Sequence, residues 1–278
     1  MQKKQRGGRR AGRRLAPTSP PIEAEADPRR SRSLEYGTAI LRCYSGSQQA
    51  LGIADIAEII GISRSTAHRY AMTLVALGHL EQDSKRKYRL AARAADSGRA
   101  AIEAIRSEVG GRAVLRELRD ELGHTVSMGV LCGTRVVYIQ RLFGHRQGQY
   151  AIDRSLESGA SIPVYCTALG KVLLASMAAP EREQLLADLD FEPQGPKAIL
   201  DRRLLAAAIE QIGSGDAVLS DEEEQAGARS LAVRVPGARA GHTLAIDVTV
   251  PSATYTAARL LKQVAPPLRR AAKLIAGS

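Results

Sequence analysis

Tryptophan is absent from this sequence of 278 residues, and all aromatic residues together make up only 4% of it. A hydrophobic core must therefore be built from aliphatic side chains, and the 44% hydrophobic content is ordinary for a globular protein. Only three cysteines occur, Cys43, Cys132 and Cys166, and no two have the spacing of a metal or redox motif. This sparse, odd set fits a reducing compartment better than a disulfide framework.

Hydrophobic runs long enough to cross a membrane are also missing, since none approaches ~18 residues. The arginine pairs near the N-terminus are followed by a segment rich in Pro, Ala and Glu, not by the apolar stretch of an export signal. We therefore expect a cytoplasmic protein without a membrane partner.

Motifs of several common enzyme classes are absent: G-x-S-x-G, G-x-G-x-x-G and H-E-x-x-H do not occur. Gly170-Lys171 resembles the end of a phosphate-binding loop, but Tyr165 stands where the opening glycine should be. The acidic run at 222–224 is interpreted as the solvated start of a helix, not as a metal site. We expect no catalytic residues, no metal and no cofactor; the enzymatic alternative is a Cys166 nucleophile with His124 as its base.

Positive charge is concentrated in the first third of the chain. Residues 1–33 hold 10 Lys/Arg and 3 Asp/Glu, residues 34–93 hold 8 and 5, and the remaining 185 residues hold 22 and 21. This distribution indicates a polyanionic partner such as nucleic acid, although a solubilising tail would have the same composition. Residues 1–33 contain few large apolar side chains, so we expect a disordered basic tail.

The residues after this tail follow the pattern of a winged helix-turn-helix. Apolar spacing predicts helices over 34–44, 53–60 and 64–77. Two short strands, 80–82 and 88–90, follow and are joined by a basic turn. A short helix, a turn containing glycine and a second helix capped by serine are typical of DNA-binding domains of this kind.

The third predicted helix has the features of a recognition helix. Isoleucines of the second helix are expected to pack against the small Ala67, which leaves the N-terminal half of the third helix exposed. Arginine can contact guanine bidentately, hydroxyl groups can reach bases or phosphates, and a helix N-terminus favours a phosphate. A three-helix dimerisation scaffold with merely solvated arginines is the alternative. The predicted DNA-binding residues are Ser63, Arg64, Ser65, Thr66, His68, Arg69, Lys85, Arg86 and Lys87.

The rest of the chain mixes helices and strands without regular alternation, which indicates an α+β fold. Residues 93–108 form an alanine-rich helical pattern that can serve as a linker, and a glycine pair ends it. Strands are predicted over 230–235 and 243–250, each with one apolar and one polar face. Pairing the apolar faces in a hairpin places Ser230 near Asp247 on the polar side.

A polar sheet face is usually solvated, but one covered by a helix is a candidate binding site. The covering element is predicted to be the helix over 167–177, preceded by Cys166 and Thr167. Free N–H groups at its start, around Ala168, can hold a carboxylate. The alternative is that Asp247 is an ordinary surface or ion-paired residue.

Several blocks resemble the IclR family of bacterial regulators, in the family's order: LGIADIAEIIGISRSTAHRY, LRELRDELGHTVSMGVLCGTRVVYIQR, IPVYCTALGKVLLA and DEEEQAGARSLAVRV. The resemblance implies a winged helix-turn-helix followed by a GAF-like effector-binding domain. Family positions for effector contacts match Ile162, Ala168, Leu169, Ser220, Ala228, Ser230, Asp247 and Thr249; with Cys166, Thr167 and Asp221 these are the predicted effector-binding residues.

Two positions depart from the family pattern. The family often has a small hydroxyl residue where Asp247 stands, and an acidic or polar residue where Ser220 stands. A carboxylate at Asp247 would repel an anionic ligand unless Arg234 or a donor on the ligand offsets it. This departure weakens a simple organic-acid assignment.

The sequence thus predicts a ligand-responsive transcriptional regulator of a metabolic or catabolic operon, acting as a homodimer or homotetramer. Its partners would be a double-stranded DNA operator and a small-molecule effector, such as an organic acid, an aromatic acid or a related metabolite. Two other hypotheses remain: a DNA-binding protein whose C-terminal half only oligomerises, and an enzyme with an accessory DNA-binding domain. The predicted segments are a tail (1–33), a DNA-binding domain (34–92), a linker helix (93–108) and an effector-binding and oligomerisation domain (109–278).

Overall fold

A computed structural model describes residues 29–44, 50–145, 156–239 and 241–277. The chain divides into two compact units, Met1–Gly98 and Arg99–Ser278. The predicted basic tail lies outside the described residues except for its last five positions. Within the described ranges, no helix combines the length and the hydrophobicity of a membrane-spanning segment.

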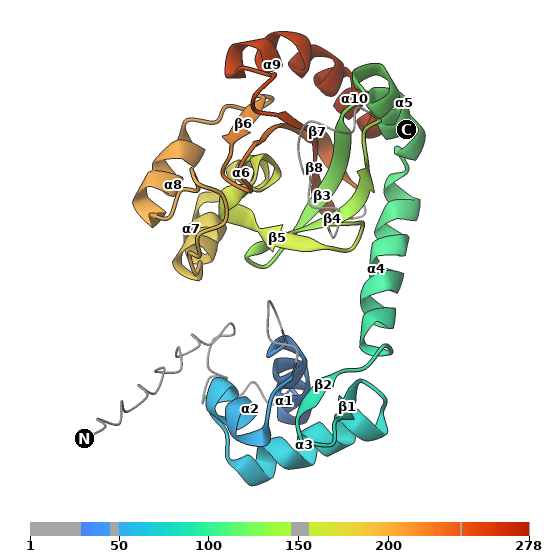
Figure 1. Ribbon diagram of the computed structural model, residues 1–278, viewed down its shortest axis with the longest axis vertical. Coiled ribbons are helices and arrows are strands. Elements are labelled where there is room, and N and C mark those ends of the chain that lie inside the picture. Colours follow the sequence, from blue (N-terminus) through green and yellow to red (C-terminus); the bar gives the residue numbers. More distant parts are fainter. Residues whose placement is uncertain (1–28, 45–49, 146–155, 240, 278) are drawn as a thin grey trace, which may run out of the picture. The chain divides into compact units, whose positions relative to one another are not determined.

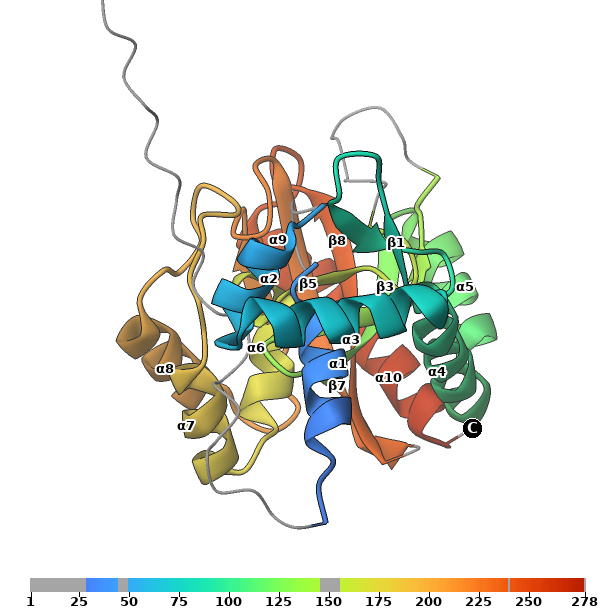
Figure 2. The same ribbon diagram turned by 90° about the horizontal axis from the view of Figure 1, so that it is seen from below.

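The first unit has the helices and the hairpin that the sequence predicts (Figure 1). Helix α1 spans Arg32–Arg42, α2 spans Ile53–Ile60 and α3 spans Arg64–Ala76. Strands β1 (Leu80–Gln82) and β2 (Tyr88–Leu90) pair antiparallel. The view from below shows α3 crossing α1, with α2 beside it (Figure 2).

Local chemistry explains how α2 and α3 are joined. Gly61 ends α2 in the left-handed conformation, with φ 71°, which glycine adopts without a steric penalty. Ile62 follows and packs against the core of this unit. Ala67 is fully buried together with Ile56, so the small side chain lies where the two helices approach each other. The expected packing of α2 against α3 is confirmed.

Helix α4, Ala94–Val109, begins in the first unit and ends in the second. Most of its side chains are exposed, and Val109 is its only buried residue. Gly110 and Gly111 both have positive φ values and separate α4 from α5, Arg112–Leu122. The helix predicted over 93–108 is therefore present, with bounds one residue later, and it is poorly buried.

The second unit is built on a six-stranded sheet with the order β5-β4-β3-β8-β7-β6, in which every neighbouring pair is antiparallel. The sequence pattern missed the two short edge strands, β5 and β6. The two late strands, predicted over 230–235 and 243–250, are longer than predicted: the first continues to Arg239, and the second begins at His242. The strands are β3 (Thr125–Cys132), β4 (Arg135–Leu142), β5 (Ser161–Pro163), β6 (Val218–Asp221), β7 (Ala228–Arg239) and β8 (His242–Pro251).

Helices cover both faces of this sheet (Figure 1). On one face, α5, α9 (Ala257–Gln263) and α10 (Ala265–Gly277) pack on aliphatic strand residues such as Ile246 and Val248. On the other face lie a short 3-10 helix, Val164–Cys166, and α6; α7 and α8 complete the same apolar cluster. Because strand side chains alternate, the polar residues of the central strands point toward α6. These three helices span Ala168–Ala175 (α6), Ala179–Ala187 (α7) and Arg202–Glu210 (α8).

Candidate DNA-binding surface and effector site

The N-terminal half of α3 is exposed and tightly capped. Ser63 is the N-cap, as predicted, and its Oγ accepts a hydrogen bond from the Thr66 N–H at 3.1 Å. The side chains of Arg64, Ser65, His68 and Arg69 are exposed, and that of Thr66 is half-buried. This end of α3 therefore presents cationic and hydroxyl groups without any role in the core.

Aromatic residues hold one of the two arginines of α3 in place. The Arg69 guanidinium lies 5.2 Å from the centre of the Tyr70 ring. The Tyr70 ring in turn lies 5.5 Å from the ring of Tyr36 on α1, and its hydroxyl is 3.3 Å from that of Ser33. Stacking of this kind restricts an arginine without removing its charge.

The β1–β2 turn is a compact basic tip. Asp83 Oδ1 accepts hydrogen bonds from the backbone N–H groups of Lys85 at 2.8 Å and Lys87 at 2.9 Å. Arg86 has φ 58°, a left-handed conformation at the tip of the turn. All three basic side chains are exposed, so the turn can contact a polyanion as the wing of a winged helix does.

A row of hydroxyl groups crosses the α6-facing side of the second unit's sheet. Ser220 on β6 is opposite Ser230 on β7, which is opposite Thr249 on β8. The hydroxyls of Ser230 and Thr249 are 2.9 Å apart, and Ser220 Oγ donates to the Cys166 carbonyl oxygen at 3.2 Å. Asp247 is two positions from Thr249 along β8 and faces the same side of the sheet, so Ser230 is its diagonal neighbour, near Asp247 on the polar side as predicted.

Asp247 lies in the neighbouring row. It is opposite Ala232 on β7 and Ser127 on β3, and Ser127 is opposite Arg141 on β4. The exposed fractions of Asp247, Ser127 and Arg141 are 1%, 0% and 7%. Burial raises the pKa of Asp247 to about 7, and the charge of Arg141 opposes this rise. Asp247 is therefore not a surface residue, and Arg141, not Arg234, is the cation whose charge acts on it.

The start of α6 packs closely onto this side of the sheet. Thr167 caps the helix, since its hydroxyl accepts a hydrogen bond from the Gly170 N–H at 2.8 Å. A side chain at Gly170 would collide with the Val164 carbonyl. Leu169 lies over Gly129 of β3, where an added Cβ would be 3.4 Å from the leucine. The predicted residues Ile162, Cys166, Ala168, Leu169 and Ala228 are all buried.

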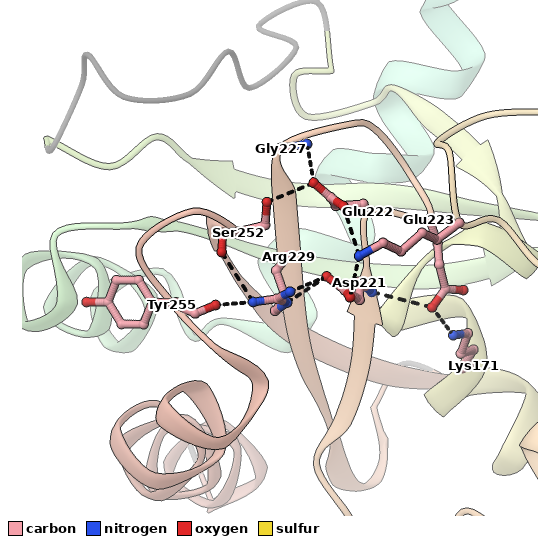
Figure 3. A network of polar contacts seen from close by, with 9 residues as sticks. Lys171, Asp221, Glu222, Glu223, Gly227, Arg229, Ser252 and Tyr255 are labelled. Carbon is pink, nitrogen blue, oxygen red and sulfur yellow. Dashed lines mark hydrogen bonds and ion pairs between the residues drawn. The ribbon is translucent and has the colours of Figure 1, made fainter.

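Asp221 is separated from the other predicted effector residues. Strand alternation turns it toward the opposite face of the sheet from Ser220, where its Oδ1 pairs with Arg229 at 2.6 Å (Figure 3). Lys197 bridges Asp221 at 2.9 Å and Glu222 at 3.0 Å. Hydrogen bonds from Lys197 and Ser252 lower the pKa of Glu222 to about 2. These ion pairs and hydrogen bonds of Asp221 and Glu222 hold the β6–β7 connection in place and lie away from α6.

The acidic run at 222–224 is not the start of a helix, so that interpretation is wrong. These residues form a bend between β6 and β7. Glu223 points inward and forms an ion pair of 2.6 Å with Lys171 of α6, in which both side chains are more than nine-tenths buried (Figure 3). This pair attaches α6 to the β6–β7 connection. Among the described residues, no group of three or more acidic, histidine or cysteine side chains is arranged to hold a metal ion.

Sequence reasoning missed the part of the site that comes from β3 and β4. Ser127, Tyr138 and Arg141 lie on the same side of the sheet as Asp247, and the Arg141 guanidinium lies 4.5 Å from the centre of the Tyr138 ring. The available signal was Ser127, a polar residue between the apolar Val126 and Met128. The sequence could not show that Ser127 lies between Asp247 and Arg141, because this depends on how β3 pairs with β8 and β4.

Comparisons with known proteins agree with both halves of the chain. Residues 33–84 match the IclR helix-turn-helix domain, and residues 101–276 match the domain described as bacterial transcriptional regulator IclR C-terminal. The HTH-type transcriptional regulator XynR of Escherichia coli K12 is 30% identical over 205 residues, covering 73% of this chain and 80% of XynR.

Two solved structures show the same fold. An IclR family transcriptional regulator from Brucella abortus aligns with a TM-score of 0.77 and 24% identity, over 92% of this chain and 97% of that one. An IclR homologue from Microbacterium hydrocarbonoxydans, solved in complex with 4-hydroxybenzoate, aligns with a TM-score of 0.63 and 21% identity, over 88% and 98% of the two chains.

Proposed function

This chain belongs to the IclR family of bacterial transcriptional regulators, and we propose that it controls a metabolic or catabolic operon in response to a small organic acid. Its helix-turn-helix domain makes it a DNA-binding protein, and its relatives are regulators, not enzymes. The observation that carries the proposal is the set of buried polar side chains, centred on Arg141 and Asp247, between the sheet and α6.

The proposed operator contacts come from α3 and the basic turn. Arg64 and Arg69 are exposed and can reach base edges in the major groove, while hydroxyl groups at the start of α3 can bind phosphates. The remaining proposed contacts are Ser63, Ser65, Thr66, His68, Lys85, Arg86 and Lys87.

The proposed effector site lies on the α6-facing side of the sheet. Its hydroxyl row, its buried carboxyl and the start of α6 converge from separate elements, as the polar groups of a ligand site do. The homologue bound to 4-hydroxybenzoate supports an organic acid as the ligand class. The earlier objection, that Asp247 would repel an anion, is weakened because the pKa of Asp247 is about 7 and Arg141 is close enough to act on it.

Each proposed role is assigned to one of four consecutive segments of the chain. Residues 1–33 serve as a basic tail, 34–92 bind DNA, 93–108 connect the halves, and 109–278 bind the effector and form the homodimer or homotetramer. Such a regulator works in the cytoplasm, where bacterial DNA is found. An effector changes DNA affinity only by binding differently to DNA-competent and incompetent states, with a typical coupling of about 1–3 kcal/mol.

One experiment tests this function. Operator sequences are selected from random DNA with the purified full-length protein, and the affinity for the best sequence is then measured with and without each member of a broad metabolite panel. We expect specific binding that at least one organic acid changes fivefold or more. Specific DNA binding that no metabolite alters would instead support a C-terminal half that only oligomerises.

A further inference from the structure

Four buried side chains on the α6-facing side of the sheet have polar atoms without a hydrogen bond of normal geometry to any described residue. These atoms are Ser127 Oγ, Tyr138 OH, Arg141 Nε and Asp247 Oδ1, and we call the four residues the Arg141 cluster. A buried polar group left unsatisfied costs about 1–3 kcal/mol, and folded proteins contain few of them. Four such atoms together therefore mark a place where a ligand can supply the missing partners.

The two ionisable groups of opposite sign in the cluster do not neutralise each other. Arg141 on β4 and Asp247 on β8 are separated by β3, so their Cα atoms are about 10 Å apart by ordinary strand spacing. Among the described residues, no ion pair joins them; the guanidinium stacks on the Tyr138 ring instead. Burial disfavours the charged guanidinium, but Tyr138 and the carboxyl groups of Glu224 and Asp247 outweigh this effect and raise the pKa of Arg141, so Arg141 stays a cation in the site.

The chemistry of these atoms restricts the ligand. A guanidinium only donates hydrogen bonds and matches a carboxylate, whereas an aspartate oxygen accepts a hydrogen bond from a hydroxyl group. A cationic ligand would be repelled by Arg141, and a second carboxylate on the ligand would be repelled by Asp247 when ionised. One anionic group and one neutral donor satisfy both ends.

We propose that the effector is a hydroxylated carboxylic acid whose carboxylate binds Arg141 and Tyr138 and whose hydroxyl group binds Asp247 and Ser127. This assignment rests on the proposed function, because it names the class of molecule that the regulator senses. If this assignment is right, residues of β3 and β4 determine ligand specificity together with α6 and the hydroxyl row of β6, β7 and β8.

Matched ligands provide the test. Isothermal titration with the full-length protein compares 4-hydroxybenzoate with benzoate and 4-hydroxybenzamide, and gluconate with hexanoate and gluconamide. These probes remove either the hydroxyl groups or the carboxylate from an aromatic and an aliphatic hydroxy acid. In at least one set, the hydroxy acid should bind, and both analogues should bind at least tenfold more weakly.

Substitutions in the site then test which residue binds the carboxylate of the ligand and which binds its hydroxyl group. Arg141→Gln should remove the preference for the acid over its amide, and Asp247→Leu should remove the preference for the hydroxylated acid. Arg116→Gln and Asp190→Asn, at exposed positions, are matched controls and should bind as wild type does. Ligand-free melting curves verify folding, and Asp247→Asn replaces the leucine variant if that variant does not fold.

Specific outcomes overturn the assignment. They are the failure of both hydroxy acids to bind, equal binding of their analogues, or unchanged preferences in the Arg141 and Asp247 variants. If a metabolite of another class still changes operator affinity, the proposed function stands and only the ligand class is wrong. If no metabolite of any class changes operator affinity, the proposed function itself fails.

Discussion

Replacing Asp247 with asparagine should stabilise the ligand-free protein, and the gain should grow as the pH rises. The carboxyl is 1% exposed, and burial raises its pKa from 3.8 to about 7. Between these pH values the folded state keeps a proton that the unfolded state releases, so wild-type stability falls as the pH rises. Asparagine has the same shape and no ionisation, so it is not subject to this loss.

The magnitude follows from the two pKa values. Each pH unit between them corresponds to 1.36 kcal/mol, so the full loss above pH 7 is roughly 4 kcal/mol. Between pH 5 and pH 8, the stability advantage of Asp247→Asn should therefore increase by roughly 3 kcal/mol. For a unit of this size, each kcal/mol shifts the melting temperature by about 2–4 °C.

Thermal unfolding of wild type and variant, measured at pH 5, 6, 7 and 8, provides the assay. The exposed Asp190→Asn variant is the control and should follow wild type at every pH. A melting-temperature difference between Asp247→Asn and wild type that stays constant from pH 5 to pH 8 would refute the reasoning. It would mean that Asp247 ionises normally in the folded protein.

Three further predictions concern DNA binding and its coupling to the effector. Arg64→Ala and Arg69→Ala should each weaken operator binding by ~1–3 kcal/mol where a bidentate base contact is lost, without lowering the melting temperature; wild-type affinity of both variants in fluorescence anisotropy would show that α3 does not read the operator. Lys85→Ala combined with Lys87→Ala should weaken binding to operator and unrelated DNA alike, and should reduce the salt slope by about 0.9 per lost phosphate contact; an unchanged slope would place the turn away from DNA. Ala101→Pro should break α4 and abolish the effector's influence on operator affinity, while calorimetry still detects effector binding; preserved coupling would contradict a role for this helix.

The first unit was predictable because its signals are local. Gly61 adopts the left-handed conformation that ends α2, and Ser63 caps the next helix through the Thr66 N–H three residues away. The hairpin at 80–90 has a polar turn between two short apolar-ended strands, and the structure contains it at the predicted bounds. Each of these determinants acts within a few residues of sequence.

The second unit was predictable as an α+β domain but not in its register. The late strands and the shared face of Ser230 and Asp247 were identified by alternation, but the direct pairing of Ser230 with Thr249 and the register shift between Arg234 and Ala238 were not. Edge strand β6 has four residues, and its partner is chosen by contacts along the sheet and not by its own pattern. Asp221 illustrates the consequence: one position along β6 from Ser220, it faces the other side of the sheet.

The two proposed binding surfaces differ in how function relates to stability. The basic residues of α3 and of the β1–β2 turn are exposed to solvent. The folded protein without DNA therefore bears no free-energy cost for burying their charges. Arg141 Nε and Asp247 Oδ1 are buried without a hydrogen bond of normal geometry, and the folded protein carries that penalty until a ligand supplies one. A ligand that supplies the missing hydrogen bonds recovers this free energy, and one that lacks either group leaves part of it unrecovered. Selectivity at such a site therefore comes from the groups that the fold leaves unsatisfied, which is why side chains unremarkable in the sequence become informative once their partners are known.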